Sequence, residues 1–370
     1  MLPNQETELF YQVALSFVPD VGPKTAKALL SKFKTAKDIF EAPLRELMTI
    51  NGLTETRVKG FRDPAVMEQT EREIEFAEQN GIQMLLIGTE NYPKRFNNCD
   101  DPPVLLYYKG NADLNAKRIV AVIGTRKNTD YGQRLTEDLV EGLQGIDDVI
   151  VVSGLALGID TIAHKASLKH GIPTIGVLGH GLDTIYPHSN KVLAEEMVQL
   201  GGLLSEFPSN TKLDRSNFPV RNRVVAGISD VTVIVESDIK GGGMITAYVA
   251  HSYDREVAAF PGRVYDSKAG GPNHLIQRNI ASMINNADDL LEIMNWGKHA
   301  QKKAVQKQLF LELSPEEQRV VDVLQQKDSL HADELSYQTG FTTSQLSSML
   351  LQMEMSGLVK ALPGKHYRLN

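Results

Sequence analysis

The chain of 370 residues contains one cysteine, Cys99, and this scarcity excludes an intramolecular disulfide framework. A chain without disulfides suits a reducing compartment, so we expect a cytoplasmic protein. Long apolar runs are also missing. No stretch of about 18 apolar residues occurs, and no membrane span is expected. The first 20 residues carry Glu6 and Glu8 and no lysine or arginine, which is atypical of a secretory signal.

Positive charge is in deficit, because 39 lysines and arginines oppose 46 aspartates and glutamates for a net charge of −7. This balance excludes a protein that coats nucleic acid or an anionic membrane over its whole surface. It leaves room for a local basic groove, because binding follows the local field. Familiar catalytic signatures are absent too, since there is no GxSxG elbow and no P-loop lysine.

The length predicts two or three domains at roughly 100–200 residues each. Residues 1–75 are predicted to form short helices with two glycine turns, in "VPDVGPKTAKALL" (18–30) and "MTINGLTETRVKGF" (48–61). Such turns resemble a doubled helix-hairpin-helix motif, which holds a DNA phosphate at a helix N-terminus. Candidate contacts are Gly22, Lys24, Gly52 and Arg57. Eight basic residues oppose seven acidic ones over 1–60, so a plain helical bundle remains an alternative.

Residues 76–296 show a different pattern, in which β-branched apolar runs alternate with amphipathic helical stretches. The runs are apolar on both faces, as buried parallel strands are. They span 118–124, 148–154, 172–179, 202–206, 231–236 and 256–262. This alternation predicts an α/β fold with a Rossmann-like open parallel sheet.

The last part of the chain is predicted to be a separate domain. A lysine-rich linker is expected over 297–313, followed by a winged helix over 314–370. The expected third helix, which reads DNA in winged helices that bind a duplex, carries no lysine or arginine. Five basic residues oppose seven acidic ones over 314–370, so we expect a protein-contact or regulatory module here.

Ligands of an open parallel sheet bind outside the carboxyl ends of its strands. Glycines there let backbone amides approach an anion, hydroxyls add donors, and arginines match phosphate geometry. Loops of this kind follow several predicted strands, and their combination predicts a phosphate-binding edge. Their residues are Gly124, Thr125, Arg126, Gly154, Arg221, Asn222, Arg223, Lys240, Gly241, Gly242, Gly243 and Thr246.

The segment "FPVRNRVVAG" (218–227) places two arginines at the mouth of an apolar run. We expect it to change from extended to helical near Asn222, so that one arginine reaches a ligand and the other pairs with an acid such as Glu206 or Glu236. A buried structural salt bridge is the alternative. Phe218 either stacks on a base or locks the helix entry as a core residue.

Several motifs occur in the order seen in the DNA-processing protein family DprA, also called Smf, and the chain resembles that family over about 85–295. They include "VIGTR" (122–126), "VVSGLALGIDTIAH" (151–164), "FPVRNRVVAGIS" (218–229) and "AAFPG" (258–262). The resemblance implies a Rossmann-like domain that binds single-stranded DNA, forms a homodimer and helps load a RecA-type recombinase in natural transformation. It implies a pocket built from Gly124–Arg126, Ser153–Gly154, Arg221–Arg223 and Lys240–Thr246. The chain departs from the family at Gly241 and Gly243, where serines are common.

A nucleotide-processing enzyme is the rival hypothesis. Related Rossmann proteins cleave nucleoside monophosphates with a glutamate in a PGGxGTxxE motif, and Val249 stands at that position here. Valine does no acid–base chemistry, so we expect a non-enzymatic protein without a cofactor. Asp160 and His164 are four residues apart, but a metal site needs more ligands, and Asp160 is expected to cap its helix.

Overall fold

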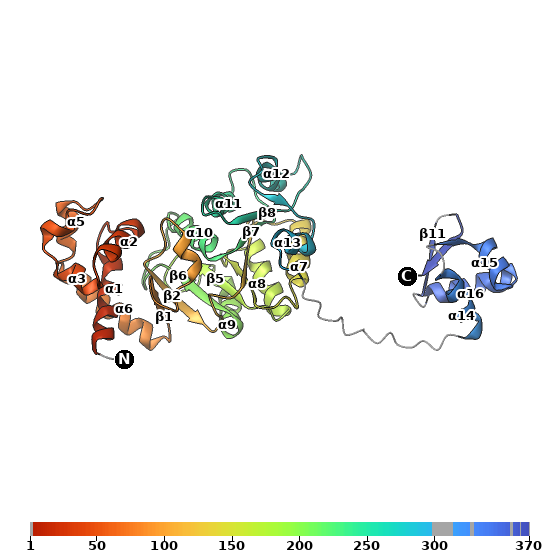
Figure 1. Cartoon of the computed structure of the whole chain (residues 1–370), viewed down its shortest axis with the longest axis horizontal. Coiled ribbons are helices and arrows are strands. Elements are labelled where there is room, and N and C mark those ends of the chain that lie inside the picture. Colours follow the sequence, from red (N-terminus) through yellow and green to blue (C-terminus); the bar gives the residue numbers. More distant parts are fainter. Residues whose placement is uncertain (1–2, 298–313, 326–328, 356–357, 363, 370) are drawn as a thin grey trace. The chain divides into compact units, whose positions relative to one another are not determined.

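The computed structural model describes residues 3–297, 314–325, 329–355, 358–362 and 364–369. The chain divides into two compact units, residues 1–299 and 300–370 (Figure 1). Apart from Gly297, the predicted lysine-rich linker lies outside the described residues. No helix in the described ranges is long and apolar enough to cross a membrane.

The first unit begins with a group of short helices, as the sequence predicts. They are α1 (Pro3–Phe17), α2 (Pro23–Lys32), α3 (Ala36–Glu41), α4 (Leu44–Leu47), α5 (Glu55–Gly60) and α6 (Pro64–Gln79). Local signals set their starts: Pro23 opens α2, while Thr35 caps α3 in a capping box and Thr54 caps α5. Helix α6 continues through residue 75, where the domain boundary is predicted.

These helices pack on the sheet domain rather than standing apart from it. Their apolar core includes Val104, which immediately precedes the second strand. Lys27 donates a hydrogen bond to the carbonyl of Cys99, and the buried carboxylate of Glu73 in α6 accepts from the backbone and hydroxyl of Ser209. The contacts explain why residues 1–299 form one unit.

A nine-stranded sheet forms the centre of this unit. Its strands are β1 (Gln83–Leu86), β2 (Leu105–Gly110), β3 (Arg118–Ile123), β4 (Val149–Ser153), β5 (Thr174–Leu178), β6 (Gly202–Ser205), β7 (Val231–Ile234), β8 (Glu256–Ala259) and β9 (Ser282–Met283). Their order is β1-β2-β6-β5-β4-β3-β7-β8-β9. All pairs from β6 to β9 are parallel, and β1 and β2 are antiparallel additions at one edge. The six predicted strands are therefore confirmed.

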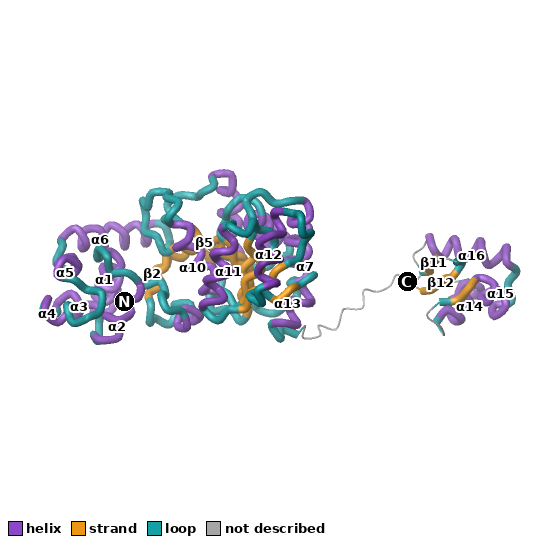
Figure 2. The backbone as a smooth tube through the Cα atoms, turned by 90° about the horizontal axis from the view of Figure 1, so that it is seen from above, coloured by secondary structure: helices purple, strands orange, loops and turns teal. Residues whose placement is uncertain are grey.

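Helices cover both faces of the sheet, which explains why its strands are apolar on both sides (Figure 2). One face packs against α7 (Asp130–Gly142), α8 (Ile159–Lys169), α9 (Lys191–Leu200) and α13 (Ala287–Ile293). The other packs against α10 (Asn217–Ile228), α11 (Gly242–Ser252) and α12 (Gly270–Gln277). Short 3-10 turns occupy Lys94–Asn98, His188–Asn190 and Ser267–Ala269.

The chain reverses its direction across the sheet at β3. The connections from β3 lead to β4, β5 and β6 on one side, whereas β7, β8 and β9 add on the other. Loops at the carboxyl ends of β3 and β7 therefore part at this point and leave a crevice, which is where open α/β sheets bind ligands.

The second unit is a winged helix, as predicted. It contains α14 (Pro315–Leu324), β10 (Leu330–His331), α15 (Ala332–Thr339), α16 (Thr343–Met355), β11 (Val359–Leu362) and β12 (His366–Leu369). Ser314 caps α14 in a capping box, and Gly340 ends α15 in a left-handed conformation. Its strands form a separate sheet in the order β10-β12-β11.

Candidate nucleic-acid interface

A cleft of about 370 Å³ lies at the carboxyl ends of β3, β4 and β7. The following residues of the predicted set line it: Gly124, Thr125, Arg126, Gly154, Phe218, Arg221, Asn222, Gly241, Gly242, Gly243 and Thr246. The fold thus brings the loops after β3, β4 and β7 and the first turns of helix α10 (Asn217–Ile228) to one place, as their common position after parallel strands predicts. We call this cavity the phosphate cleft below.

Two helices begin at the phosphate cleft without a side-chain cap. Gly158 precedes α8 and Gly241 precedes α11, and neither helix start has a capping hydrogen bond from a side chain. The first backbone N–H groups of a helix lack partners within the helix and attract anions. In α8 the first of them, that of Ile159, donates to the carbonyl of Thr125 at 3.2 Å, so the later ones of its first turn remain. Gly158 has a φ of 81°, and a side chain there would collide with Thr125 and Arg126. Glycine therefore allows the β3 and β4 loops to meet.

Arg126 is the exposed cation of the phosphate cleft. Its guanidinium lies over the ring of Phe218, 5.1 Å from the ring centroid, and the structure shows no ion pair for it among the described residues. Phe218 itself is half-buried, and its ring lies 6.5 Å from that of Tyr186. The charge of Arg126 thus remains available to a phosphate, and the Phe218 ring helps hold the side chain in place.

Arg221 is buried, with 6% of its surface exposed, although it forms part of the cleft wall. Its Nη1 donates to the carbonyls of Gly154 and Val177, and its Nε donates to Asn222 at 3.1 Å. Burial lowers the pKa of its guanidinium, and the charge of Asp160 opposes that change. Arg221 therefore joins α10 to the loop after β4 and to strand β5 from behind the cleft.

Arg223 lies away from the phosphate cleft. Its guanidinium makes a two-pronged ion pair with Glu206 and also donates to the backbone of Asp101. Both arginines belong to α10, which begins at Asn217, so the predicted change of conformation near Asn222 is wrong. Positions two apart on a helix point in different directions. The prediction that one arginine pairs with Glu206 is confirmed. Arg223 is not part of the cleft lining, and its contact with DNA stays a prediction.

Two other predicted residues also lie outside the cleft lining. Ser153 is fully buried and donates to the carbonyl of Val122, which joins β4 to β3 beneath the cleft. Lys240 is exposed on the loop before α11. Neither side chain forms part of the cavity wall.

Asp160 organises the cleft, and sequence reasoning assigned it a different role. It lies in the first turn of α8, whose N-cap is Gly158, so the predicted helix cap is wrong. Its Oδ2 accepts from the backbone N–H groups of Gly154 and Ala156 at 3.1 and 3.4 Å, which folds the preceding loop. Burial raises the pKa of its carboxyl, and the charge of Arg221 acts in the opposite direction.

His164 lies one turn further along α8 and is fully buried. Its Nδ1 lies 2.7 Å from the hydroxyl of Thr174, which itself donates to the carbonyl of Val151. The hydroxyl must then accept, so Nδ1 carries the proton. Burial and the charge of Arg221 lower the pKa of His164 to about 3. No cluster of three potential metal ligands occurs in the part of the chain that the structure describes.

Sequence reasoning missed further cleft residues. Ala156, Ser237 and Asp238 line the cavity together with Asp160. Ser237 and Asp238 follow β7 directly, so the rule that ligands lie beyond strand ends was sufficient to find them.

The predicted helical hairpins lie among the N-terminal helices α1 to α6 of the same unit. Lys24 is exposed in the first turn of α2, and Gly22 is its N-cap. Gly52 adopts a φ of 89° before α5, where Arg57 donates to its carbonyl at 2.5 Å and lies 4.0 Å from Asp20. Arg57 thus stabilises its own turn. Whether this surface meets DNA stays a prediction.

Comparison with known proteins decides the family. The family model described as DNA recombination-mediator protein A matches residues 83–295. The chain belongs to this family. A DprA winged helix domain matches residues 307–365, and a SAM-like helix-hairpin-helix tandem matches residues 13–60. The predicted DprA/Smf family and its two flanking domain types are therefore confirmed.

Relatives of this DprA-family chain come from distant bacteria. DNA processing protein DprA of Bacillus subtilis is 40% identical over 215 residues, which are 58% of this chain and 72% of that protein. Protein Smf of Synechocystis is 29% identical and aligns with 98% of this chain and 99% of its own length. The alignment with Smf thus extends over all three predicted domains.

Two solved structures share the fold. DprA from Streptococcus pneumoniae has a TM-score of 0.63 at 31% identity, covering 76% of this chain and 95% of that one. DNA processing protein A from Helicobacter pylori has a TM-score of 0.52 at 34% identity, covering 58% and 95%. The H. pylori protein is described as having a unique single-stranded DNA binding mode.

Proposed function

We propose that the phosphate cleft binds single-stranded DNA and that the protein acts as a non-enzymatic recombination mediator. The observation that carries the proposal is the convergence of two uncapped helix starts with the exposed guanidinium of Arg126 at one crevice. Backbone N–H groups and a guanidinium together match the oxygens of a phosphate. The family membership and the H. pylori relative support the same ligand.

A single strand suits the cleft better than a duplex. The cavity of about 370 Å³ accommodates only a small part of a chain, and the guanidinium of Arg126 over the ring of Phe218 offers a planar surface for a base. A reader of duplex DNA is expected to present a basic stripe, whereas this chain has a net charge of −7. Two arginines, Arg126 and Arg221, line the cleft together with Asp160 and Asp238, so the exposed charge of Arg126 is a local feature and not part of a stripe.

The biological role that we propose follows the family. The bound strand is protected and passed to a RecA-type recombinase in natural transformation or recombination, and the protein works as a homodimer through its Rossmann-like domain. Membership in the DNA recombination-mediator family supports this proposal. Light scattering of the purified chain tests the dimer, and a RecA filament assay on strand covered by a single-strand-binding protein tests the loading.

Anisotropy of a labelled oligothymidylate, compared with duplex and with mononucleotides, tests the DNA proposal. Arg126→Ala should weaken strand binding and reduce the slope of log K against log salt by about 0.7, the value for one phosphate contact on a single strand. Arg134→Ala is the matched control, because Arg134 is exposed on α7 outside the cleft. Equal slopes for both variants would argue against contact at Arg126.

The same experiment addresses the rival nucleotide-cleaving enzyme. If mononucleotides bind and oligothymidylate does not, or if base is released from a nucleoside monophosphate, the enzyme hypothesis replaces ours. Val249 is half-buried in α11 and offers no acid or base there.

A further inference from the structure

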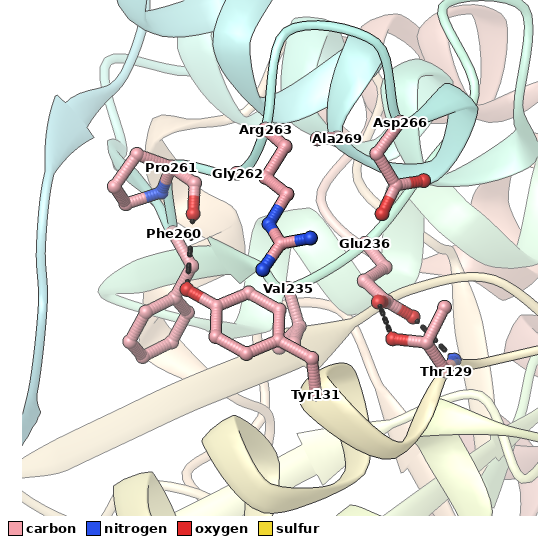
Figure 3. Close-up of a pocket in the computed structure, with 10 residues that line it drawn as sticks. All are labelled: Thr129, Tyr131, Val235, Glu236, Phe260, Pro261, Gly262, Arg263, Asp266 and Ala269. Atoms are coloured by element: carbon pink, nitrogen blue, oxygen red, sulfur yellow. Dashed lines mark hydrogen bonds between the residues drawn. The ribbon is translucent and has the colours of Figure 1, made fainter.

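A second cavity, of about 660 Å³, opens at the same sheet edge as the phosphate cleft (Figure 3). Its walls come from the start of α7 and from the segments that follow β7 and β8. The lining residues are Thr129, Tyr131, Val235, Glu236, Phe260, Pro261, Gly262, Arg263, Asp266 and Ala269. None of them belongs to the phosphate cleft lining, and no role for them follows from the proposed function.

The two cavities are neighbours. Glu236 lines the second cavity, whereas the next residue, Ser237, lines the phosphate cleft. The backbone N–H of Thr125, another cleft residue, donates to the carbonyl of Glu236 at 2.8 Å. The hydrogen-bonded backbone of Thr125 and Glu236 thus lies between the two cavities, and a chain that leaves the cleft over Thr125 runs towards the second one.

The walls of the second cavity suit a planar ring. Val235 and Phe260 are buried, and the side chains of Pro261 and Tyr131 extend the apolar surface to the rim. The hydroxyl of Tyr131 donates to the carbonyl of Pro261 at 3.2 Å, which holds its half-exposed ring across the opening. An aromatic wall fixed in this way favours stacking on a base.

The polar groups offer both donors and acceptors. In Figure 3 the guanidinium of Arg263 extends into the cavity, and within the described ranges no hydrogen bond or ion pair engages that side chain. The Glu236 carboxylate accepts from the backbone and hydroxyl of Thr129, and Asp266 accepts from the backbone of Lys268 at 2.9 Å. Glu236 is buried and both of its oxygens are engaged by Thr129, so the half-buried Asp266 is the carboxylate that retains lone pairs for the N–H donors of a ligand.

One nucleobase matches this pattern on both edges. Guanine presents O6 and N7 to a guanidinium, which is the commonest specific arginine contact, and its N1–H and N2 amino groups suit carboxylates. Thymine has neither the acceptor pair nor the amino group. The apolar wall, the free arginine and the Asp266 carboxylate together match the groups of guanine.

We propose that the second cavity is a guanine subsite for the bound strand. A strand whose phosphate occupies the cleft crosses at Thr125 and Glu236, and it places one base against Tyr131 and Arg263. This inference rests on the proposed single-strand function, and it adds a base preference to a cleft that otherwise reads only the backbone.

The test compares oligothymidylate with the same oligonucleotide carrying one central guanine, by anisotropy with the full-length protein. The guanine oligonucleotide should bind about fivefold tighter or more, as one bidentate contact does. Arg263→Ala should abolish the preference and leave oligothymidylate affinity unchanged, whereas the Arg134→Ala control should keep the preference.

Replacing guanine by 7-deazaguanine removes N7 and should reduce the preference in the wild type but not in Arg263→Ala. Hypoxanthine, which lacks the N2 amino group, should reduce it in the wild type and not in Asp266→Asn.

The outcomes separate this inference from the function on which it rests. If oligothymidylate fails to bind, the proposed function fails. If it binds and the single guanine adds nothing, only the guanine subsite is wrong. If Arg263→Ala lowers the affinity for both oligonucleotides equally, Arg263 contacts a phosphate and the guanine subsite is wrong. Competition by free guanosine monophosphate at micromolar concentration would also overturn it, in favour of a free-nucleotide site.

Discussion

Arg126 and Arg221 line the same cleft and have different relations to solvent. Arg126 is exposed, whereas Arg221 is buried and donates to two backbone carbonyls beside the carboxylate of Asp160. A buried charge that loses its partner costs far more than a surface one. Arg221 therefore stabilises the fold as well as lining the cleft. Replacing Arg221 by alanine should lower stability, whereas replacing Arg126 should not.

Arg221→Ala should lower the free energy of unfolding by about 3–5 kcal/mol, because it leaves two buried carbonyls without their donor and the buried Asp160 without its neighbouring positive charge. Arg126→Ala should change it by less than about 0.5 kcal/mol, as surface substitutions do. Urea unfolding followed by tryptophan fluorescence of Trp296 measures both. If the urea midpoint of Arg221→Ala equals that of the wild type, the hydrogen bonds and charge of Arg221 contribute little to stability.

His164 should make stability depend on pH. Its ordinary pKa is about 6.5, and in the fold it is lowered to about 3. Below pH 6.5 the unfolded chain therefore takes up a proton that the folded chain does not, and stability falls as pH falls towards 3. At pH 5 the loss amounts to about 2 kcal/mol.

The variant His164→Asn keeps a donor towards Thr174 and cannot be protonated. Its stability should fall less steeply than that of the wild type between pH 7 and pH 5, as measured by urea unfolding at both values. His188→Asn is the control, because His188 is exposed. Parallel pH profiles for the wild type and His164→Asn would mean that His164 titrates normally in the fold.

At the scale of elements, the start of α11 carries Gly241 and Gly243, where serines are common in the family. The space around each glycine shows whether a serine would fit there. A side chain at Gly241 would collide with the hydroxyl of Ser237 and lie 2.9 Å from the carbonyl of Asp238. A side chain at Gly243 would meet Ile123 and Ser237 at 3.4 and 3.6 Å, which are ordinary contacts. The two glycines are therefore not equivalent.

Gly243→Ser should be tolerated and should raise stability by about 0.5 kcal/mol, because glycine loses more chain entropy on folding. Its hydroxyl should also strengthen strand binding. Gly241→Ser should lower the melting temperature, because the loop before α11 must shift. Thermal unfolding and anisotropy of the two single variants give the comparison, and equal melting temperatures would contradict it.

Helix α10 explains the paired arginines. Its start at Asn217 turns Arg221 towards the strand ends and Arg223 towards Glu206 and Asp101 on another side. One arginine thereby supports the cleft and the other anchors the helix to the β6 loop and to the segment before β2. A single element thus positions the site and attaches itself to the rest of the unit.

At the scale of the whole molecule, the net acidity lies outside the cleft. The winged helix carries seven acidic and five basic residues, and α16 has neither lysine nor arginine. The described helices and strands of this unit pack around an apolar core of their own. We expect the two units to fold independently and only the first to bind the strand.

A chain ending at Gly297 should therefore keep its affinity for oligothymidylate to within about twofold, since each unit has its own core. Anisotropy of the shortened chain and of the full-length protein at equal salt tests this. A tenfold loss would assign the missing part of the chain a direct role in binding.

The sequence by itself determined the parallel sheet, its order of motifs, the flanking helical and winged parts and the edge at which the cleft opens. These features could be predicted because runs that are apolar on both faces, glycine turns and helix caps are patterns of neighbouring residues. It missed the edge strands β1, β2 and β9, which are short and whose pairing partners lie elsewhere in the chain.

Only the tertiary structure decided what each charged residue does. Whether Arg223 meets a ligand or Glu206 depends on where α10 begins, and Asp160 is recognised as a loop organiser only when Gly154 and Arg221 are seen around it. The second cavity joins residues about 130 positions apart, such as Tyr131 and Pro261. Burial and partner choice depend on such distant contacts, and no local pattern encodes them.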